Sequence, residues 1–247
     1  MCSIAIGDLH GNAAALGDLL EQLAGQLSAQ DIVVFPGDYV DRGADSRGCI
    51  QRILDFRSSS LATVVGLMGN HEDWMLRSLR DPTRHSWILG MDALPTIDSY
   101  SRTVGDHLRA AMVELGPRLI NERVDLADQM FADAIPADQL DFLQNLQPYY
   151  RVGDTVFAHA GLDPAGGAVE EQQTQTLIWG TEEFLRHDEG TGFVVYGHWN
   201  DGLLDQTGWP RPRLCRSSIG IDTITSGVLS AVIIPECRVI QSARHAA

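Results

Sequence analysis

The chain has 247 residues, of which 44% are hydrophobic, so it can bury a full core at a size where α/β folds are often undivided. Its formal net charge is −15 and its 18 basic residues are all arginines, which argues against a nucleic-acid-binding face, since such a face needs a basic stripe. Its four cysteines form no C-x-x-C pair, so the sequence does not indicate a zinc knuckle or a thioredoxin-type motif. No charged leader precedes an apolar stretch, and no apolar run is long enough to cross a membrane. We therefore expect a cytoplasmic protein whose partners include neither nucleic acid nor membranes.

The first third of the chain alternates between short apolar runs and amphipathic stretches. The predicted elements are, in chain order, a strand at Ser3–Ile6, a helix capped by Asn12 and ending near Leu27, a strand at Ile32–Phe35, a helix capped by Ser46, a strand at Leu61–Leu67 and a helix from about Glu72 to Arg80. This alternation indicates βαβ units.

Residues 81–148 have a different character, with several prolines and only short helical patterns between them. The clearest of these patterns is Pro136–Leu146. We interpret 81–148 as a helical insertion within a single domain that spans residues 1–247. Insertions on a rigid scaffold often line a cleft and select the substrate, although plain packing is the alternative for this one.

The last part of the chain returns to strands. The predicted strands are Tyr149–Val152, Thr155–Ala158, Phe193–Tyr196, Ser218–Ile221, Val228–Ile234 and Arg238–Gln241, and the predicted surface loops are Gly190–Gly192 and Asp205–Pro212. The first two strands flank Gly153-Asp154, which predicts a hairpin.

Short polar blocks follow five of the predicted strands directly. They are Gly7-Asp8-Leu9-His10-Gly11, Gly37-Asp38-Tyr39-Val40-Asp41-Arg42-Gly43, Gly69-Asn70-His71-Glu72, His159-Ala160-Gly161 and Gly197-His198. In open α/β sheets, ligands bind beyond the carboxyl ends of the strands. We therefore expect these blocks to meet at one edge of the fold.

The side chains of these blocks are the types that hold a pair of divalent cations. The predicted ligands are Asp8 and His10 for one ion, and Asn70, His159 and His198 for the other. Asp38 is the predicted bridge between the two ions, because it lies between the other groups in chain order and in predicted strand order.

A hydroxide activated by two metal ions can attack phosphorus near neutral pH. His71 is the predicted proton donor to the leaving oxygen, and Asp41 would hold its imidazole in the required tautomer. Arg42 offers a bidentate fork for the phosphate oxygens, with Asn70 beside it in the substrate site. The predicted reaction is hydrolysis without a covalent enzyme intermediate.

Each block also has a structural interpretation. Asp8 could cap a strand-to-helix turn, and Asp41 could form a structural ion pair with Arg42. His159 and His198 could be hydrogen-bonded core histidines, but the five blocks together favour the metal centre. Residues without such context are assigned no role, and we expect His85, His107, His187 and His245 in solvent. The tryptophans are expected in the core or the cleft wall, with base stacking as the alternative; they are Trp74, Trp87, Trp179, Trp199 and Trp209.

Taken together, the five blocks resemble the phosphoprotein phosphatase family of calcineurin-like metallophosphoesterases. The resemblance runs from Gly7 to His198 and is weak in the insertion. It implies an α/β sandwich of two mixed β-sheets flanked by helices. It also implies two divalent metal ions, with manganese expected first and iron, zinc, nickel, cobalt or magnesium as alternatives.

The resemblance implies metal-dependent hydrolysis of phosphomonoesters, with phosphoserine or phosphothreonine proteins, and in some members phosphotyrosine, as the first expected substrate. The alternatives are symmetrical hydrolysis of dinucleoside tetraphosphates and, without catalysis, binding of phosphorylated ligands. One departure bears on this choice, because Thr181 stands where bacterial relatives carry a second phosphate-binding arginine. Phosphate would then be held by Arg42 alone or by another arginine such as Arg186. The sequence leaves the oligomeric state open.

Overall fold

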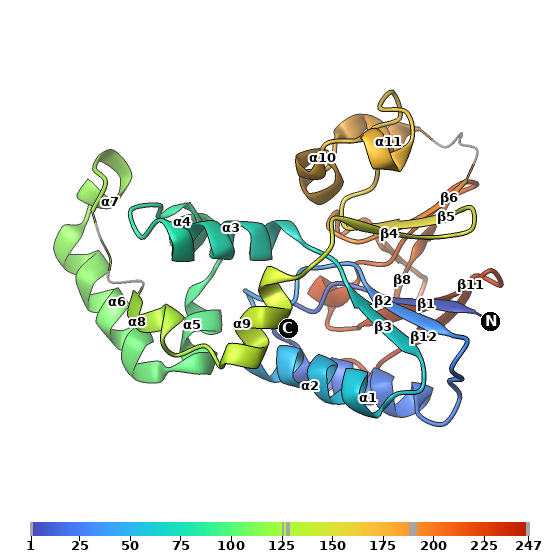
Figure 1. The fold of residues 1–247 in the computed structure, drawn as a ribbon, viewed down its shortest axis with the longest axis horizontal. Coiled ribbons are helices and arrows are strands. Elements are labelled where there is room, and N and C mark those ends of the chain that lie inside the picture. The colour runs from blue at the N-terminus through green and yellow to red at the C-terminus, as the bar shows by residue number, and fades with distance from the viewer. Residues whose placement is uncertain (1, 125, 127–128, 188–191, 246–247) are drawn as a thin grey trace.

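The computed structural model describes residues 2–124, 126, 129–187 and 192–245. Two five-stranded mixed sheets pack against each other, and helices cover their outer faces (Figure 1). The predicted α/β sandwich of two mixed sheets flanked by helices is therefore confirmed. Within the described residues, no helix is long and apolar enough to span a membrane.

The first sheet has the order β12-β11-β1-β2-β3. Its strands are β1 Ser3–Ile6, β2 Ile32–Phe35, β3 Thr63–Gly66, β11 Ser230–Ile234 and β12 Arg238–Gln241. β1, β2 and β3 are parallel, and β11 joins β1 in the antiparallel sense. Parallel pairing brings the carboxyl ends of β1, β2 and β3 to one edge, which is the edge predicted to carry the polar blocks.

The second sheet has the order β4-β5-β6-β10-β9. Its strands are β4 Tyr149–Val152, β5 Thr155–Ala158, β6 Phe193–Tyr196, β9 Arg213–Leu214 and β10 Ser218–Gly220. β5, β6 and β10 are parallel, so the chain leaves β5 and β6 at a common edge as well.

The loop predictions had mixed outcomes. Part of the stretch 205–212 is not a loop, since β8 (Pro210–Arg211) pairs with β7 (Leu203–Leu204) in a small hairpin. Asp205 closes that hairpin by accepting hydrogen bonds from the backbone of residues 207 and 209. Most of the predicted loop at 190–192 lies outside the described residues.

Side-chain alternation along the strands assigns the core to three layers. On β2, Val33 and Phe35 face the helices, whereas Val34 faces the second sheet. The layer between the sheets contains Ala5, Val34, Val65, Leu67, Phe157, Val195, Ile219, Ile221, Val232 and Ile234. Burial of each larger apolar side chain contributes about 1.5–3 kcal/mol, so this layer holds the strand ends firmly in place.

Helices α1 (Ala13–Leu23) and α2 (Ser46–Ser59) cover the outer face of the first sheet, and α10 (Thr174–Trp179) and α11 (Glu182–Arg186) lie on the side of the second (Figure 1). α1 ends earlier than predicted, shortly before Gly25, whose φ of +76° is not helical. The cap of α2 is Asp45 rather than Ser46, since the Asp45 side chain accepts the Gly48 N–H.

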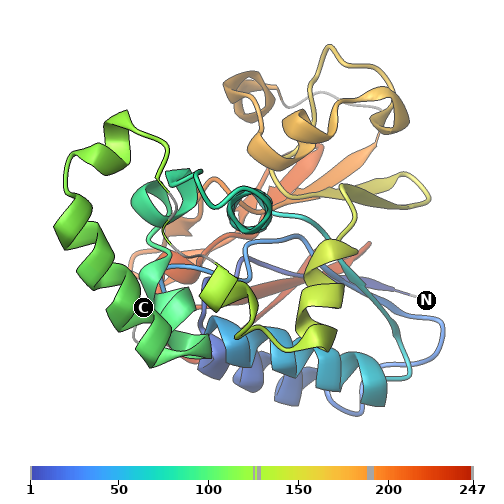
Figure 2. The ribbon, with the colours of Figure 1, turned by 60° about the vertical axis from the view of Figure 1, so that its left-hand side comes forward.

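The stretch 81–148 is mostly helical. After α3 (Asn70–Arg80) it contains α4 Ser86–Gly90, α5 Leu94–Tyr100, α6 Arg102–Leu115, α7 Arg118–Asn121, α8 Gln129–Ala132 and α9 Ala137–Gln144. Helices α4 to α8 extend from the sandwich on the side of α3 (Figure 2). Their apolar side chains join the core beneath the first sheet. The boundaries of the single domain and of the insertion stay predictions.

Candidate metal centre

The loops that follow β1 and β2 turn sharply to present their side chains. His10 and Asp38 have φ values of +41° and +54°, a left-handed backbone region that non-glycine residues rarely adopt. The N–H groups of Leu9 and His10 both donate to the Asp38 carbonyl, at 2.9 Å each. The two loops are therefore tied together, and such strained conformations cluster at functional sites.

Glu72 holds the loop after β2 in place through hydrogen bonds. Its carboxylate is fully buried and accepts the backbone N–H groups of Asp38, Tyr39, Val40 and Gly69, at 2.8–3.2 Å. Burial and the nearby Asp38 raise the pKa of Glu72 to about 7. The sequence did not predict this role for Glu72. The available signal was an acidic side chain in the first turn of a helix, a position from which it can accept backbone N–H groups.

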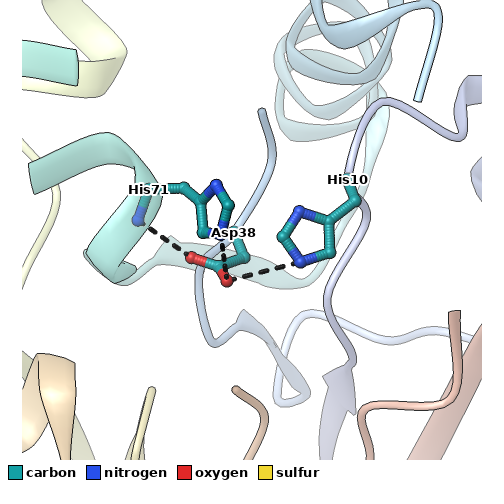
Figure 3. Close-up of side chains that lie close together, drawn as sticks. All are labelled: His10, Asp38 and His71. Atoms are coloured by element: carbon teal, nitrogen blue, oxygen red, sulfur yellow. Dashed lines mark hydrogen bonds and ion pairs between the residues drawn. The ribbon is translucent and has the colours of Figure 1, made fainter. Parts of the chain in front are cut away.

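Asp38 lies between imidazoles on two sides. Its Oδ2 is 3.5 Å from His10 Nε2 and 3.8 Å from His71 Nε2, and its Oδ1 accepts the His71 backbone N–H at 3.3 Å (Figure 3). On the other side, Oδ1 is 3.3 Å from His159 Nε2. Burial alone would raise the pKa of Asp38, but the His159 and His71 imidazoles hold it well below its ordinary value. The two carboxylate oxygens thus face different nitrogen donors.

A second group of donor atoms lies on the far side of Asp38. Asn70 Oδ1 is 3.0 Å from both His159 Nε2 and His198 Nδ1, and these two nitrogens are 3.2 Å apart. Burial lowers the pKa of His198 to about 3, and that of His10 likewise, so both rings keep a lone pair for a cation. Donors bound to one ion at about 2.0–2.2 Å lie roughly 3 Å apart, so this group fits a divalent metal.

The close donor atoms form two sets that share Asp38, one with His10 and His71 and one with His159 and His198. Asp8, the predicted partner of His10, lies beside these two sets and belongs to neither. Its Oδ2 accepts the His198 backbone N–H at 2.8 Å, while its buried Oδ1 has no hydrogen-bond partner among the described residues. Burial and the charges of Asp222 and Asp38 raise the pKa of Asp8 well above its ordinary value. A buried carboxylate oxygen without a donor is costly, and a cation would satisfy it.

Asp222 is a further acidic group that sequence reasoning missed. It is buried, its Oδ2 accepts the Asn200 N–H at 2.8 Å, and burial raises its pKa to about 6. Its Oδ1, like Asp8 Oδ1, has no partner within the described part of the chain. The available signal was its position directly after the predicted strand at 218–221, since Asp8 and Asp38 also lie within three residues of the ends of their strands.

His71 and Asp41 form a buried pair next to Asp38. His71 Nδ1 lies 2.7 Å from Asp41 Oδ2, and both side chains are at most 3% exposed. Against the effect of burial, Asp38 and the hydrogen-bonded Asp41 raise the pKa of His71 above its ordinary value. This environment suits a proton donor.

The two arginines considered for phosphate binding lie in different places. Arg42 is exposed and places Nη2 3.4 Å from His71 Nε2, so it borders the centre. Arg186, in contrast, forms an exposed ion pair with Glu182 of the same helix at 2.7 Å. The structure thus brings Arg42, and not Arg186, together with the predicted catalytic groups.

Residues 3–202 match the profile of the calcineurin-like phosphoesterase family. The chain belongs to this family. The prediction of a metallophosphoesterase is therefore confirmed at the level of the family, whereas the narrower phosphoprotein phosphatase branch stays a prediction.

Solved structures share the fold. A putative diadenosine tetraphosphatase superposes with a TM-score of 0.63 at 22% identity, over 100% of this chain and 95% of that one. A cold-active protein-tyrosine phosphatase of a psychrophilic Shewanella species superposes with a TM-score of 0.53 at 15% identity, over 97% of this chain and 77% of that one. At these identities the likeness extends to the fold alone.

Among curated proteins, the zinc-dependent endopolyphosphatase of Saccharomyces cerevisiae is 26% identical over 85 residues. The match covers 34% of this chain and a quarter (25%) of that protein.

Proposed function

We propose that this protein hydrolyses phosphomonoesters with the help of two divalent cations, manganese first among them. The proposed ligands are Asp8 and His10 for one cation, Asn70, His159 and His198 for the other, and Asp38 for both. The observation that carries the proposal is the position of Asp38, whose two oxygens face His10 and His159 on opposite sides. A carboxylate so placed can be shared between two ions.

Two bound cations would neutralise phosphate charge and lower the pKa of water, so that hydroxide would be available as the nucleophile near neutral pH. The side chains then have separate tasks. His71 would give a proton to the leaving oxygen, and Asp41 would keep its Nδ1–H fixed at 2.7 Å. Arg42, exposed beside His71, would bind two phosphate oxygens through its guanidinium fork.

We propose a phosphorylated protein as the first substrate, on serine or threonine and also on tyrosine. Arg42 is exposed next to the buried donor His71, an arrangement that admits a phosphate presented from outside on a large partner. The overall acidic charge disfavours a polyanionic substrate with several phosphates in contact with the surface.

A dinucleoside tetraphosphate is the second candidate, and one observation favours it. Trp74 lies one helical turn after His71 and contacts Trp179, with ring centroids 4.9 Å apart. Both rings are half-buried, and Trp179 is fixed by a hydrogen bond from Nε1 to Asp73. Such a pair could stack on a base.

The test is turnover of p-nitrophenyl phosphate, a phosphoserine peptide and diadenosine tetraphosphate by the manganese-loaded protein and by His71→Asn. Peptide hydrolysis that the variant loses supports the first proposal. Rapid cleavage of the dinucleotide with little peptide turnover would replace it with the second. Absence of all turnover, with metal still bound, would instead indicate a protein that only binds phosphorylated ligands.

A further inference from the structure

The Asp41 carboxylate is held by two side chains of the stretch 81–148. Trp87, on α4, donates its Nε1–H to Asp41 Oδ2 at 2.9 Å, the same oxygen that His71 Nδ1 approaches. Thr96, on α5, donates its hydroxyl to Asp41 Oδ1 at 2.9 Å. Asp41 and Thr96 are 0% exposed and Trp87 is 1% exposed, so water does not compete for these bonds.

The direction of each hydrogen bond follows from counting hydrogens. The Thr96 hydroxyl has one hydrogen, which Asp41 Oδ1 receives, so its oxygen must accept from the other neighbours. These are the Asp41 backbone N–H at 2.7 Å and the Ser46 hydroxyl at 2.9 Å. Thr96 therefore forms hydrogen bonds with both the backbone and the carboxylate of Asp41. A rotation of that carboxylate would break a buried hydrogen bond.

The backbone of this loop also depends on the same region. Asp41 and Arg42 have φ values of +72° and +66°, two successive left-handed residues that are not glycine. The Arg42 N–H donates to the Asp92 carbonyl, between α4 and α5, at 3.2 Å. Without these contacts the loop would relax toward commoner backbone conformations.

We propose that Thr96 and Trp87 are positioning residues for the proton donor, which act on His71 through Asp41. This inference rests on the proposed function, in which His71 protonates the leaving oxygen. The stretch 81–148 then does more than line a cleft, because two of its side chains fix the orientation of the His71 imidazole. The chemistry predicts a specific signature, since proton donation matters most when the leaving group is a poor one.

The experiment compares phenyl phosphate, whose leaving group is poor, with p-nitrophenyl phosphate, whose leaving group is good. The variants are Thr96→Val, which removes the hydroxyl and keeps the shape of the side chain, and Trp87→Phe, which removes the indole N–H and makes the side chain smaller. Thr96→Ser restores the hydroxyl and should restore the rate. Tyr100→Phe is the matched control, since it removes a buried hydroxyl of α5 that bonds to Gln139 and does not contact Asp41.

For Thr96→Val we expect kcat on phenyl phosphate to fall about 10- to 100-fold, which is part of the roughly 10²- to 10⁴-fold that a general acid supplies, and kcat on p-nitrophenyl phosphate to fall less than about threefold. KM and bound metal should stay unchanged. Trp87→Phe should show the same selectivity, and Tyr100→Phe should show none.

Two outcomes would overturn the inference. One is an equal loss on both substrates in Thr96→Val and Trp87→Phe, and the other is a leaving-group effect in Tyr100→Phe of the same size. His71→Asn separates this failure from that of the proposed function. If His71→Asn loses phenyl phosphate turnover selectively while Thr96→Val and Trp87→Phe do not, only the positioning role is wrong. If His71→Asn shows no selectivity, the role of His71 itself is wrong.

Discussion

The candidate centre has two halves that differ in how well their buried polar atoms are satisfied. In the half around Asp41, both carboxylate oxygens accept hydrogen bonds, from His71, Trp87 and Thr96. In the half around Asp38, the described residues leave Asp8 Oδ1 and Asp222 Oδ1 without a donor. In the half around Asp41, the protein itself satisfies both carboxylate oxygens. The half around Asp38 needs a partner for its buried carboxylate oxygens that the protein does not supply, and the donor types there indicate divalent cations.

The charges of the two halves support the same distinction. Asp8, Asp38 and Asp222 are buried near one another, and burial with mutual repulsion raises the pKa of Asp8 and Asp222. In the other half, burial raises the pKa of Asp41 as well, but this carboxylate has direct partners in His71, Trp87 and Thr96. Cations should therefore stabilise the half around Asp38 strongly and the half around Asp41 hardly at all.

The largest effect is expected from Asp38→Ala, because Asp38 belongs to both groups of donor atoms. Both ions should be lost, and turnover should fall by more than about 10⁴-fold, the upper end of what one general acid supplies. Elemental analysis and initial rates measure these effects. Asp55→Ala, on the exposed face of α2, is the control and should keep both properties. Two metal ions in Asp38→Ala would disprove the bridge.

His71→Asn should lower kcat by about 10²- to 10⁴-fold, because it removes the proposed proton donor. The bound metal should not change, since the variant leaves all the proposed ligands of both ions in place: Asp8, His10, Asp38, Asn70, His159 and His198. Steady-state kinetics and elemental analysis of the same preparation measure both quantities. Loss of metal in this variant would place His71 among the ligands, which its 3.8 Å approach to Asp38 would then explain.

Removal of metal should lower the free energy of unfolding. A cation at 100 times its dissociation constant contributes about 2.7 kcal/mol, and the effect should reverse when manganese is returned. Thermal unfolding with and without chelator measures the shift. Thr96→Val should keep the full shift and Asp38→Ala should lose it, which sharpens the contrast between the two halves. An unchanged melting temperature in the wild-type protein would contradict a metal-dependent half.

The smallest effect is expected from Glu72→Gln. The carboxylate of Glu72 accepts four backbone N–H groups, and an amide would present its own N–H₂ to some of them. Unsatisfied buried groups cost about 1–3 kcal/mol, which urea unfolding can measure. Glu21→Gln, on the exposed side of α1, should cost almost nothing. Equal stability of the two variants would show that Glu72 does not hold the loop.

The sequence predicted the arrangement of the metal half better than that of the other half. Parallel strands end at a common edge, so blocks that follow strands must converge, and the structure brings Asp38, Asn70 and His159 within hydrogen-bond or ion-pair distance. The offset of Asp8 could not be predicted, because it depends on a side-chain rotamer and on the backbone of residue 198.

The contributions of Trp87 and Thr96 had no signal in the sequence, because their partner lies about 50 residues away and neither belongs to a polar block. The prediction for His85 was wrong for a related reason. It was expected in solvent, but it is 6% exposed and its ring nitrogens lie 3.0 and 2.6 Å from the Leu119 and Val124 carbonyls. Contacts within a helical insertion depend on tertiary packing, which short helical patterns do not encode.

Anomalous diffraction from crystals grown with manganese would locate the two cations that we place beside the Asp38 carboxylate. We expect two anomalous peaks, one on the His10 side of Asp38 and one on the side of Asn70, His159 and His198. A single peak, or peaks away from Asp38, would show that this carboxylate does not bridge two ions.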